Sequence, residues 1–367
     1  MTSILLEKTI KHLQALVAFD TCNPPRKIQE SGIIDYLTEQ LSDAQVEIMD
    51  YGDGSINVYA VKGQPEYLFN FHIDTVPVAQ GWETDPFVLT VKDDKAYGLG
   101  SCDIKGAAAC FLACVEQGLS DYAVLFSSDE EYGNSLCVKS FLQQKHNYAG
   151  VIVAEPTQCK AVLAHRGVAT AEVSFTAKSG HSSESRTLTE NAIHQATSWM
   201  TQAIEWATAE LESNYHNLHG VCLNLGKIEG GVKPNIIAPS VTLHMGIRPL
   251  PGEDPQQKIQ EMVSSIKTSY PVSVTAKFIA PSFPSVLAEN HSGQNELGNT
   301  LLANKLGLEI SEPVNFWTEA ALFSAAGLPA IVYGPGNIDK AHTANEWVAL
   351  SDLKTVVMNY WRMLGDD

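Results

Sequence analysis

The chain has 367 residues, of which 44% are hydrophobic and 18% are charged. Its 24 basic and 42 acidic residues give a net charge of -18 at pH 7, which argues against nucleic acid and anionic membranes as partners, because both attract basic surfaces. The chain is longer than most domains that have a single hydrophobic core, so we expect two domains.

The cysteines and the N-terminus indicate the compartment. The seven cysteines are an odd number, and no two of them form a CxxC pair. The first residues, Met1 to Lys8, lack the basic segment and long apolar run of a signal peptide. No apolar run reaches the length of a membrane span. These features predict a cytoplasmic protein with reduced thiols.

The first third of the chain alternates between helix and strand patterns. Apolar residues at helical spacing predict three helices, at 5–19, 33–41 and 105–117. Short apolar runs predict strands at 46–48, 57–61, 69–71, 123–126 and 150–153. This alternation predicts an α/β domain with a mostly parallel sheet and helices on its faces.

The middle of the chain has a different order of elements. We expect strands at 171–177, 221–228, 240–247 and 272–278, and helices at 188–212 and 255–268. The long helix has an apolar stripe that runs from Leu188 to Leu211. The resulting βαββαβ order is that of a ferredoxin-like domain. Such a unit leaves one sheet face or edge free, so we expect a homodimer formed through it.

The last stretch returns to α/β character, with expected helices at 294–306, 319–326 and 350–363 and a strand at 330–333. The middle unit is therefore predicted to be inserted into the first domain. We expect residues 1–167 and 280–367 to form the catalytic domain, and residues 168–279 to form the inserted domain.

Potential metal ligands stand where three of the predicted buried strands end. These residues are His72, Asp74, Glu130, Glu131 and Glu155. Acids and imidazoles that gather at the carboxyl ends of neighbouring strands are costly unless cations lie among them. The pattern predicts a metal site, and two zinc ions are the first expectation.

The spacing of these residues gives limited further detail. His72 and Asp74 are two apart on an extended segment and face one side, so Asp74 can orient a ligating His72. Chemistry alone leaves open whether Glu130 or Glu131 is a ligand or a base. Gly98-x-Gly100-x-x-Asp103 imitates a dinucleotide fingerprint, but the Asp103 carboxylate would repel a pyrophosphate and could instead bridge two cations.

Five segments, in the same order, resemble the zinc aminoacylase and metallopeptidase family that includes acetylornithine deacetylase, succinyl-diaminopimelate desuccinylase and glutamate carboxypeptidases. They are residues 71–77, 97–106, 128–131, 154–157 and 341–346. The resemblance implies that His72 and Glu155 hold one zinc, that Glu131 and His342 hold the second, and that Asp103 bridges them. Cobalt or manganese are the alternative metals. A cis peptide bond after Asp103 is also implied.

The resemblance also implies the other site residues. Glu130 would be the general base, Asp74 would support His72, and His181 would reach the reacting carbonyl, usually from a partner subunit. Asn235 and Arg248 would grip the substrate. Three further residues would line the substrate pocket, and these are Thr318, Glu319 and Gly334.

The substrate expected from the resemblance is an N-acetyl amino acid. Segments 317–320 and 333–336 favour N-acetyl-L-ornithine, cleaved to ornithine and acetate in arginine biosynthesis. The alternatives are N-acetyl-L-citrulline, N-succinyl-diaminopimelate and small peptides. Glu319 could favour the ornithine cation, or it could be an acid at a helix N-terminus. A module that binds such ligands without cleaving them is the alternative from another class.

Overall fold

The computed structural model describes residues 1–133, 135–285 and 292–365, and the chain divides into two compact units. The first unit comprises Met1–Leu163, Gly293–Ser311 and Thr318–Asp367, and the second comprises Ala164–Ser292 and Glu312–Trp317. The sequence placed the crossings near Gly167 and Ala280. The second unit begins earlier because the backbones of His165 and Phe283 pair, and because the Ala164 carbonyl accepts from Val314 N at 3.1 Å.

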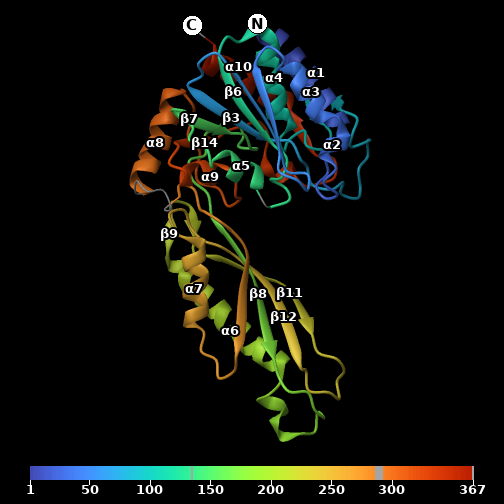
Figure 1. Ribbon diagram of the computed structural model, residues 1–367, viewed down its shortest axis with the longest axis vertical. Helices are drawn as coiled ribbons and strands as arrows, with labels where there is room; N and C mark the ends of the chain where they lie inside the picture. Colours follow the sequence, from blue (N-terminus) through green and yellow to red (C-terminus); the bar gives the residue numbers. More distant parts are fainter. Residues whose placement is uncertain (134, 286–291, 366–367) are drawn as a thin grey trace. The chain divides into compact units, whose positions relative to one another are not determined.

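A six-stranded sheet forms the centre of the first unit (Figure 1). Its order is β1 (Gln45–Asp50), β2 (Ile56–Lys62), β6 (Tyr122–Ser127), β3 (Tyr67–His72), β7 (Gly150–Val153) and β14 (Ala330–Val332). The last four of these run parallel, whereas β1 and β2 are antiparallel neighbours at one edge. The predicted α/β fold with a mostly parallel sheet is confirmed.

Helices pack against this sheet to form the core of the first unit. They are α1 (Thr2–Ala18), α2 (Ile28–Ser31), α3 (Ile33–Gln40), α4 (Lys105–Gly118), α5 (Leu136–Phe141), α8 (Ser292–Lys305), α9 (Ala320–Ala325) and α10 (Leu350–Leu364). Helices α1, α4 and α10 contact one another, and Figure 1 shows α1 beside α4. Phe69 of β3 packs against Phe111 of α4 and Tyr360 of α10, with ring centroids 5.4 and 5.0 Å apart. Among the described residues, no helix is both long and apolar enough to span a membrane.

A small three-stranded sheet brings residues 347–349 beside residues 95–97. Its order is β15 (Trp347–Ala349), β5 (Lys95–Tyr97) and β4 (Thr90–Lys92), and Trp347 pairs with Tyr97. The 3₁₀ turn η3 (Ile338–Lys340) comes shortly before β15. This pairing places the residues just before Trp347 next to the residues just after Tyr97.

The second unit is a four-stranded antiparallel sheet with two helices. The sheet order is β11 (Cys222–Gly230), β12 (Ser240–Arg248), β8 (Val168–Thr176) and β13 (Val272–Ala280), and the helices are α6 (Ala192–Ala209) and α7 (Pro255–Ser265). Alternate residues of β8, from Ala169 to Phe175, are buried in one core with residues of both helices. A short hairpin of β9 (Asn214–Tyr215) and β10 (Leu218–His219) precedes β11. The predicted ferredoxin-like βαββαβ unit is confirmed.

The long helix of this unit is shorter than its sequence pattern predicted. Asn191 is its N-cap, and the Asn191 side chain accepts from Ile193 N at 3.0 Å. Leu188 and Leu211 lie in 3₁₀ turns outside the helix, η1 (Ser185–Leu188) and η2 (Glu210–Glu212), and are 79% and 55% exposed. These two leucines therefore do not belong to the buried stripe, and their assignment to it was wrong.

A buried histidine in α1 makes stability depend on pH. His12 is 2% exposed, with Nδ1 2.7 Å from the Tyr36 hydroxyl and Nε2 3.0 Å from Glu116. Burial lowers the pKa of His12 from 6.5, although Glu116 opposes the shift. Between pH 6.5 and the lowered pKa, the unfolded chain therefore binds a proton that the folded protein does not bind.

We expect the stability from neutral His12 to be complete above pH 6.5 and to be lost as the pH falls toward the lowered pKa. Between about pH 7 and about pH 5, urea unfolding should show a steeper loss of stability for the natural protein than for His12→Gln. Parallel pH profiles for the two proteins would contradict this expectation.

Candidate metal centre

The parallel strands bring three of the predicted segments to one edge of the central sheet. His72 ends β3, Glu130 and Glu131 follow β6, and Glu155 follows β7. In the register, His72 lies opposite Ser127 of β6, and Asn70 of β3 lies opposite Val153 of β7. Because parallel neighbours end at the same edge, their terminal side chains meet there.

Asp103 lies between two histidines. Asp103 Oδ1 is 3.0 Å from His72 Nε2, and Asp103 Oδ2 is 3.2 Å from His342 Nε2. Asp103 stands just before α4, and His342 stands in the loop before β15. The peptide bond after Asp103 is cis, as the family resemblance implied. The two oxygens of one carboxylate therefore face different imidazoles.

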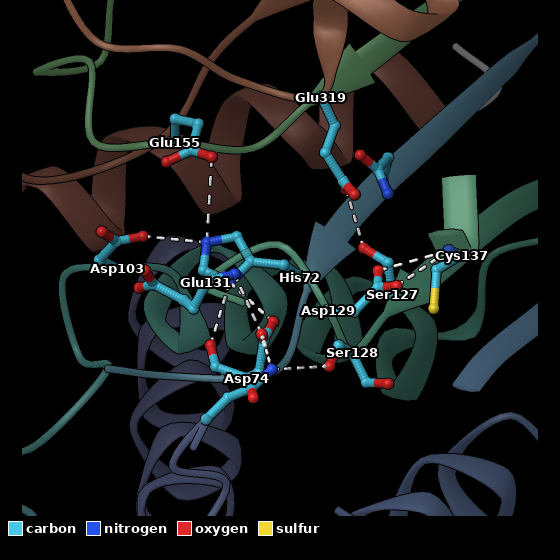
Figure 2. Close-up of polar contacts among 12 residues, drawn as sticks. His72, Asp74, Asp103, Ser127, Ser128, Asp129, Glu131, Cys137, Glu155 and Glu319 are labelled. Carbon is cyan, nitrogen blue, oxygen red and sulfur yellow. Dashed lines mark hydrogen bonds and ion pairs between the residues drawn. The ribbon is translucent and has the colours of Figure 1, made fainter. Parts of the chain in front are cut away.

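Each histidine also faces a glutamate. Glu155 Oε1 lies 3.9 Å from His72 Nε2, and Glu131 Oε1 lies 2.9 Å from His342 Nε2. Figure 2 shows Glu155 and Asp103 both approaching His72. Donor atoms of His72, Asp103 and Glu131 all lie within 4.8 Å of one another. The donors thus form two sets that share Asp103, one with His72 and Glu155 and one with Glu131 and His342.

The pKa shifts within this cluster indicate an excess of buried negative charge. Burial and the Asp103 charge raise the pKa of Glu155 well above its usual range. Burial likewise raises the pKa of Glu130, and the Glu131 charge adds to this while His72 opposes it. Hydrogen bonds to Asp103 and Glu131 raise the pKa of His342 to about 11. Divalent cations would relieve this charge, and imidazole nitrogens and carboxylate oxygens are ligands that zinc accepts.

Asp74 supports two members of the cluster. Its backbone carbonyl accepts from His72 Nδ1 at 3.0 Å, and its Oδ2 accepts from Glu131 N at 3.0 Å. The carboxylate Oδ1 is farther from His72 Nδ1, at 3.6 Å. Asp74 therefore lies where the sequence expected it, but its closest contact with His72 is made by the backbone.

Asn23 also supports the cluster, and the sequence did not predict this role. Its Nδ2 donates to Asp74 Oδ2 at 2.8 Å and lies 3.4 Å from the Ser128 carbonyl. In the sequence, Asn23 stands shortly after the predicted helix at 5–19, directly before two prolines. An asparagine before two prolines was the one available signal, and it does not specify a contact with Asp74.

The three predicted pocket residues of the first unit lie in two loops. Thr318 and Glu319 come just before α9, and Gly334 follows β14. Glu319 is 1% exposed and its Oε2 accepts from Ser127 Oγ at 2.8 Å. Burial and the Asp129 charge raise the pKa of Glu319 to about 8. A Cβ added at Gly334 would lie 2.6 Å from the Glu155 carbonyl oxygen, so this loop packs tightly on the Glu155 segment. Contacts of these three residues with a substrate stay predictions.

Of the three predicted site residues in the second unit, two lie together and the third lies apart. His181 forms a bridge with Ile236, and Ser182 N donates to the Asn235 carbonyl at 3.1 Å. Arg248 is the last residue of β12, and that strand begins five residues after Asn235. A nine-residue strand is about 25 Å long. His181 and Asn235 are therefore neighbours at one end of the sheet, and Arg248 is at the other end.

Residues 68–365 match the family described as Peptidase family M20/M25/M40. The chain belongs to this family. N-acetyl-L-citrulline deacetylase of Xanthomonas campestris pv. campestris is 43% identical in a 365-residue alignment that covers 98% of each protein. Acetylornithine deacetylase of Pasteurella multocida is 33% identical in a 313-residue alignment that covers 80% of this chain and 78% of the relative.

A solved member of the M20 family has the same fold. The M20 family metallo-carboxypeptidase Sso-CP2 from Sulfolobus solfataricus superposes with a TM-score of 0.75, at 16% identity, over 97% of this chain and 98% of that one. The resemblance stated from the sequence is confirmed, and so is the prediction of an enzyme of the metal-dependent hydrolase class.

Proposed function

We propose that this protein hydrolyses the amide of an N-acetyl amino acid with the aid of two divalent metal ions. The observation that carries the proposal is the Asp103 carboxylate, whose two oxygens face His72 and His342. One ion would be held by His72, Glu155 and Asp103, and the other by Glu131, His342 and Asp103. Zinc is the first candidate, and cobalt and manganese are the alternatives.

The reaction would use Glu130 as its general base. Divalent ions held by these residues would lower the pKa of a water molecule and polarise the acyl carbonyl. Glu130 takes a proton from the attacking water and returns it to the leaving amine. Asp74 keeps His72 and the Glu131 backbone in place during this exchange.

We propose N-acetyl-L-citrulline as the preferred substrate and N-acetyl-L-ornithine as the second candidate. The sequence motifs favoured N-acetyl-L-ornithine. However, the N-acetyl-L-citrulline deacetylase is more similar to this chain than the acetylornithine deacetylase is, and it is matched over nearly its whole length. The state of Glu319 supports the same order. With a pKa of about 8, its buried carboxyl is mostly neutral at neutral pH and would attract an ammonium group weakly. The ureido group of citrulline is neutral and does not require an ionised carboxylate as its partner.

We also propose that the active unit is a homodimer in which His181 and Asn235 act on the partner's substrate. These residues lie about 25 Å from Arg248 along one sheet, a span that no small N-acetyl amino acid can bridge. Arg248 lies beside Arg166, whose Nη1 donates to the Arg248 carbonyl at 3.1 Å. His181 and Arg248 of one chain would therefore not contact the same substrate molecule.

The proposed compartment is the cytoplasm. All seven cysteines are free thiols, and five of them are buried. Burial raises the pKa of the Cys110 thiol well above its usual range, so this thiol is poorly reactive. Free, protonated thiols suit a reducing compartment.

A substrate panel tests the proposed reaction. We expect kcat/KM to be highest for N-acetyl-L-citrulline, with N-acetyl-L-ornithine next and N-succinyl-diaminopimelate and dipeptides at least about tenfold lower. The Glu319→Gln variant, which is neutral at every pH, should keep the natural order of the two acetylated substrates. Faster cleavage of dipeptides than of either acetylated amino acid would replace this proposal with a peptidase.

A further inference from the structure

A buried glutamate that we have assigned no role holds the loop that carries Asp103. Glu346 is 2% exposed. Its Oε1 accepts from Cys102 N at 2.8 Å and from Asp103 N at 3.0 Å, and its Oε2 accepts from Gly100 N at 2.9 Å. Three backbone N–H groups of one short loop thus converge on a single carboxylate. Both oxygens of this one side chain accept from the loop, so the loop backbone is held at three points.

The position of Glu346 follows from the small sheet. Because Trp347 of β15 pairs with Tyr97 of β5, the residue before Trp347 meets the loop that follows Tyr97. The Glu346 carbonyl accepts from Gly98 N at 3.1 Å, which fixes the backbone of Glu346 as well as its side chain. The preceding residue is also fixed, since Asn345 Oδ1 accepts from Glu83 N at 2.8 Å.

The segment that contains Glu346 also carries His342, four residues earlier. His342 and Asp103 approach each other to 3.2 Å. Asp103 and His342 are proposed metal ligands that are distant in the sequence. Their segments are therefore also linked through the hydrogen bonds of Glu346. A shift of the Gly100–Asp103 loop would change the distance from Asp103 to both histidines.

The loop has little space to adjust without this carboxylate. A Cβ added at Gly106 would lie 2.4 Å from the Ser101 carbonyl oxygen, and one added at Gly100 would lie 2.7 Å from Thr75 Cγ2. A glutamine at position 346 would match the volume of the glutamate. However, its NH₂ group would face a backbone N–H and could not accept from it.

We infer that Glu346 is a positioning residue that sets the metal-bridging Asp103 and couples it to the His342 segment. Both oxygens of Glu346 accept from backbone N–H groups, so it acts on the metal site through the Asp103 loop rather than as a ligand. This inference rests on the proposed two-metal function.

The test is a comparison of zinc affinity in Glu346→Gln and in a matched control. Asp121→Asn makes the same change of carboxylate to amide in a side chain that also accepts from a backbone N–H, that of Gln64 at 2.6 Å. Chelator competition should show that Glu346→Gln raises the zinc dissociation constant by about 10- to 100-fold. It should also lower kcat with little change in KM. Asp121→Asn should differ from the natural protein by no more than about twofold.

Amide hydrogen exchange on the metal-free natural protein removes any dependence on the folding of the variant. The N–H groups of Gly100, Cys102 and Asp103 should be strongly protected before any zinc is added. In Glu346→Gln their exchange should become faster, while amides of β3 keep their natural rates. Natural zinc affinity and kcat in Glu346→Gln, or fast exchange of the three amides in the natural protein, would overturn the inference.

The same measurements separate this inference from the proposed function. If the natural protein binds two zinc ions but releases no acetate from any N-acetyl amino acid, the proposed function fails and the affinity comparison still decides the role of Glu346. If Glu346→Gln keeps its zinc affinity while the natural protein cleaves N-acetyl-citrulline, only the inference about Glu346 fails.

Discussion

Replacing Glu130 with glutamine is expected to remove about 10²- to 10⁴-fold of the turnover while both metal ions remain bound. Glutamine keeps the size of the side chain but cannot take a proton from water at neutral pH. The neighbouring Glu131 contacts His342 at 2.9 Å, so Glu131→Gln should instead weaken metal binding. This pair of variants decides which acid is the base, a choice that the sequence pattern alone left open.

The measurement is kcat for acetate release together with the zinc content of each purified variant. Glu309→Gln serves as the control, because Glu309 is an exposed acid that pairs with Lys160. It should keep both activity and zinc. If Glu130→Gln keeps the natural turnover, Glu130 is not the base. If Glu130→Gln loses its zinc while Glu131→Gln retains all of its zinc, the two assigned roles are exchanged.

Mixing two inactive variants is expected to restore activity if the partner supplies His181. His181→Ala alone should lose about 10²- to 10³-fold in kcat, since it removes a group at the developing oxyanion. Glu130→Ala is inactive for a different reason. A dimer with one chain of each kind has one complete site, formed by Glu130 of one chain and His181 of the other. After subunit exchange, random pairing should give about a quarter of the natural activity.

A second mixture controls for unspecific recovery. Glu130→Ala and His342→Ala both damage the first unit, so their mixed dimers have no complete site and should stay inactive. Absence of recovery in the first mixture, when mixed dimers are demonstrated by affinity tags, would show that His181 does not act across subunits. A monomer in sedimentation would also contradict the proposed arrangement.

The sequence predicted most of the fold because its signals were local. Short apolar runs gave strands such as β3 and β6 to within a few residues, and their parallel pairing explains why His72, Glu130 and Glu155 come to one edge. The ends of α6 were not predicted, because apolar spacing continued to Leu188 and Leu211 whereas the helix starts after the Asn191 cap.

The supporting contacts of the site could not be predicted, because they join residues that are distant in the sequence. Asn23 reaches Asp74 across 51 positions, and Glu346 reaches Asp103 across 243. Their residue types are common, and nothing in their local sequence specifies a partner. Asp74 shows a related difficulty, because its spacing predicted an orienting role but not that its carbonyl would be the closer acceptor.

Zinc titration of the metal-free protein, with acetate release from N-acetyl-L-citrulline measured at each addition, tests the central claim most directly. We expect no activity without metal, saturation at two equivalents per chain, and strongly weakened binding of both equivalents in Asp103→Asn, since Asp103 faces both histidines. Full activity in protein shown to be free of metal, or tight binding of both equivalents in Asp103→Asn, would contradict it.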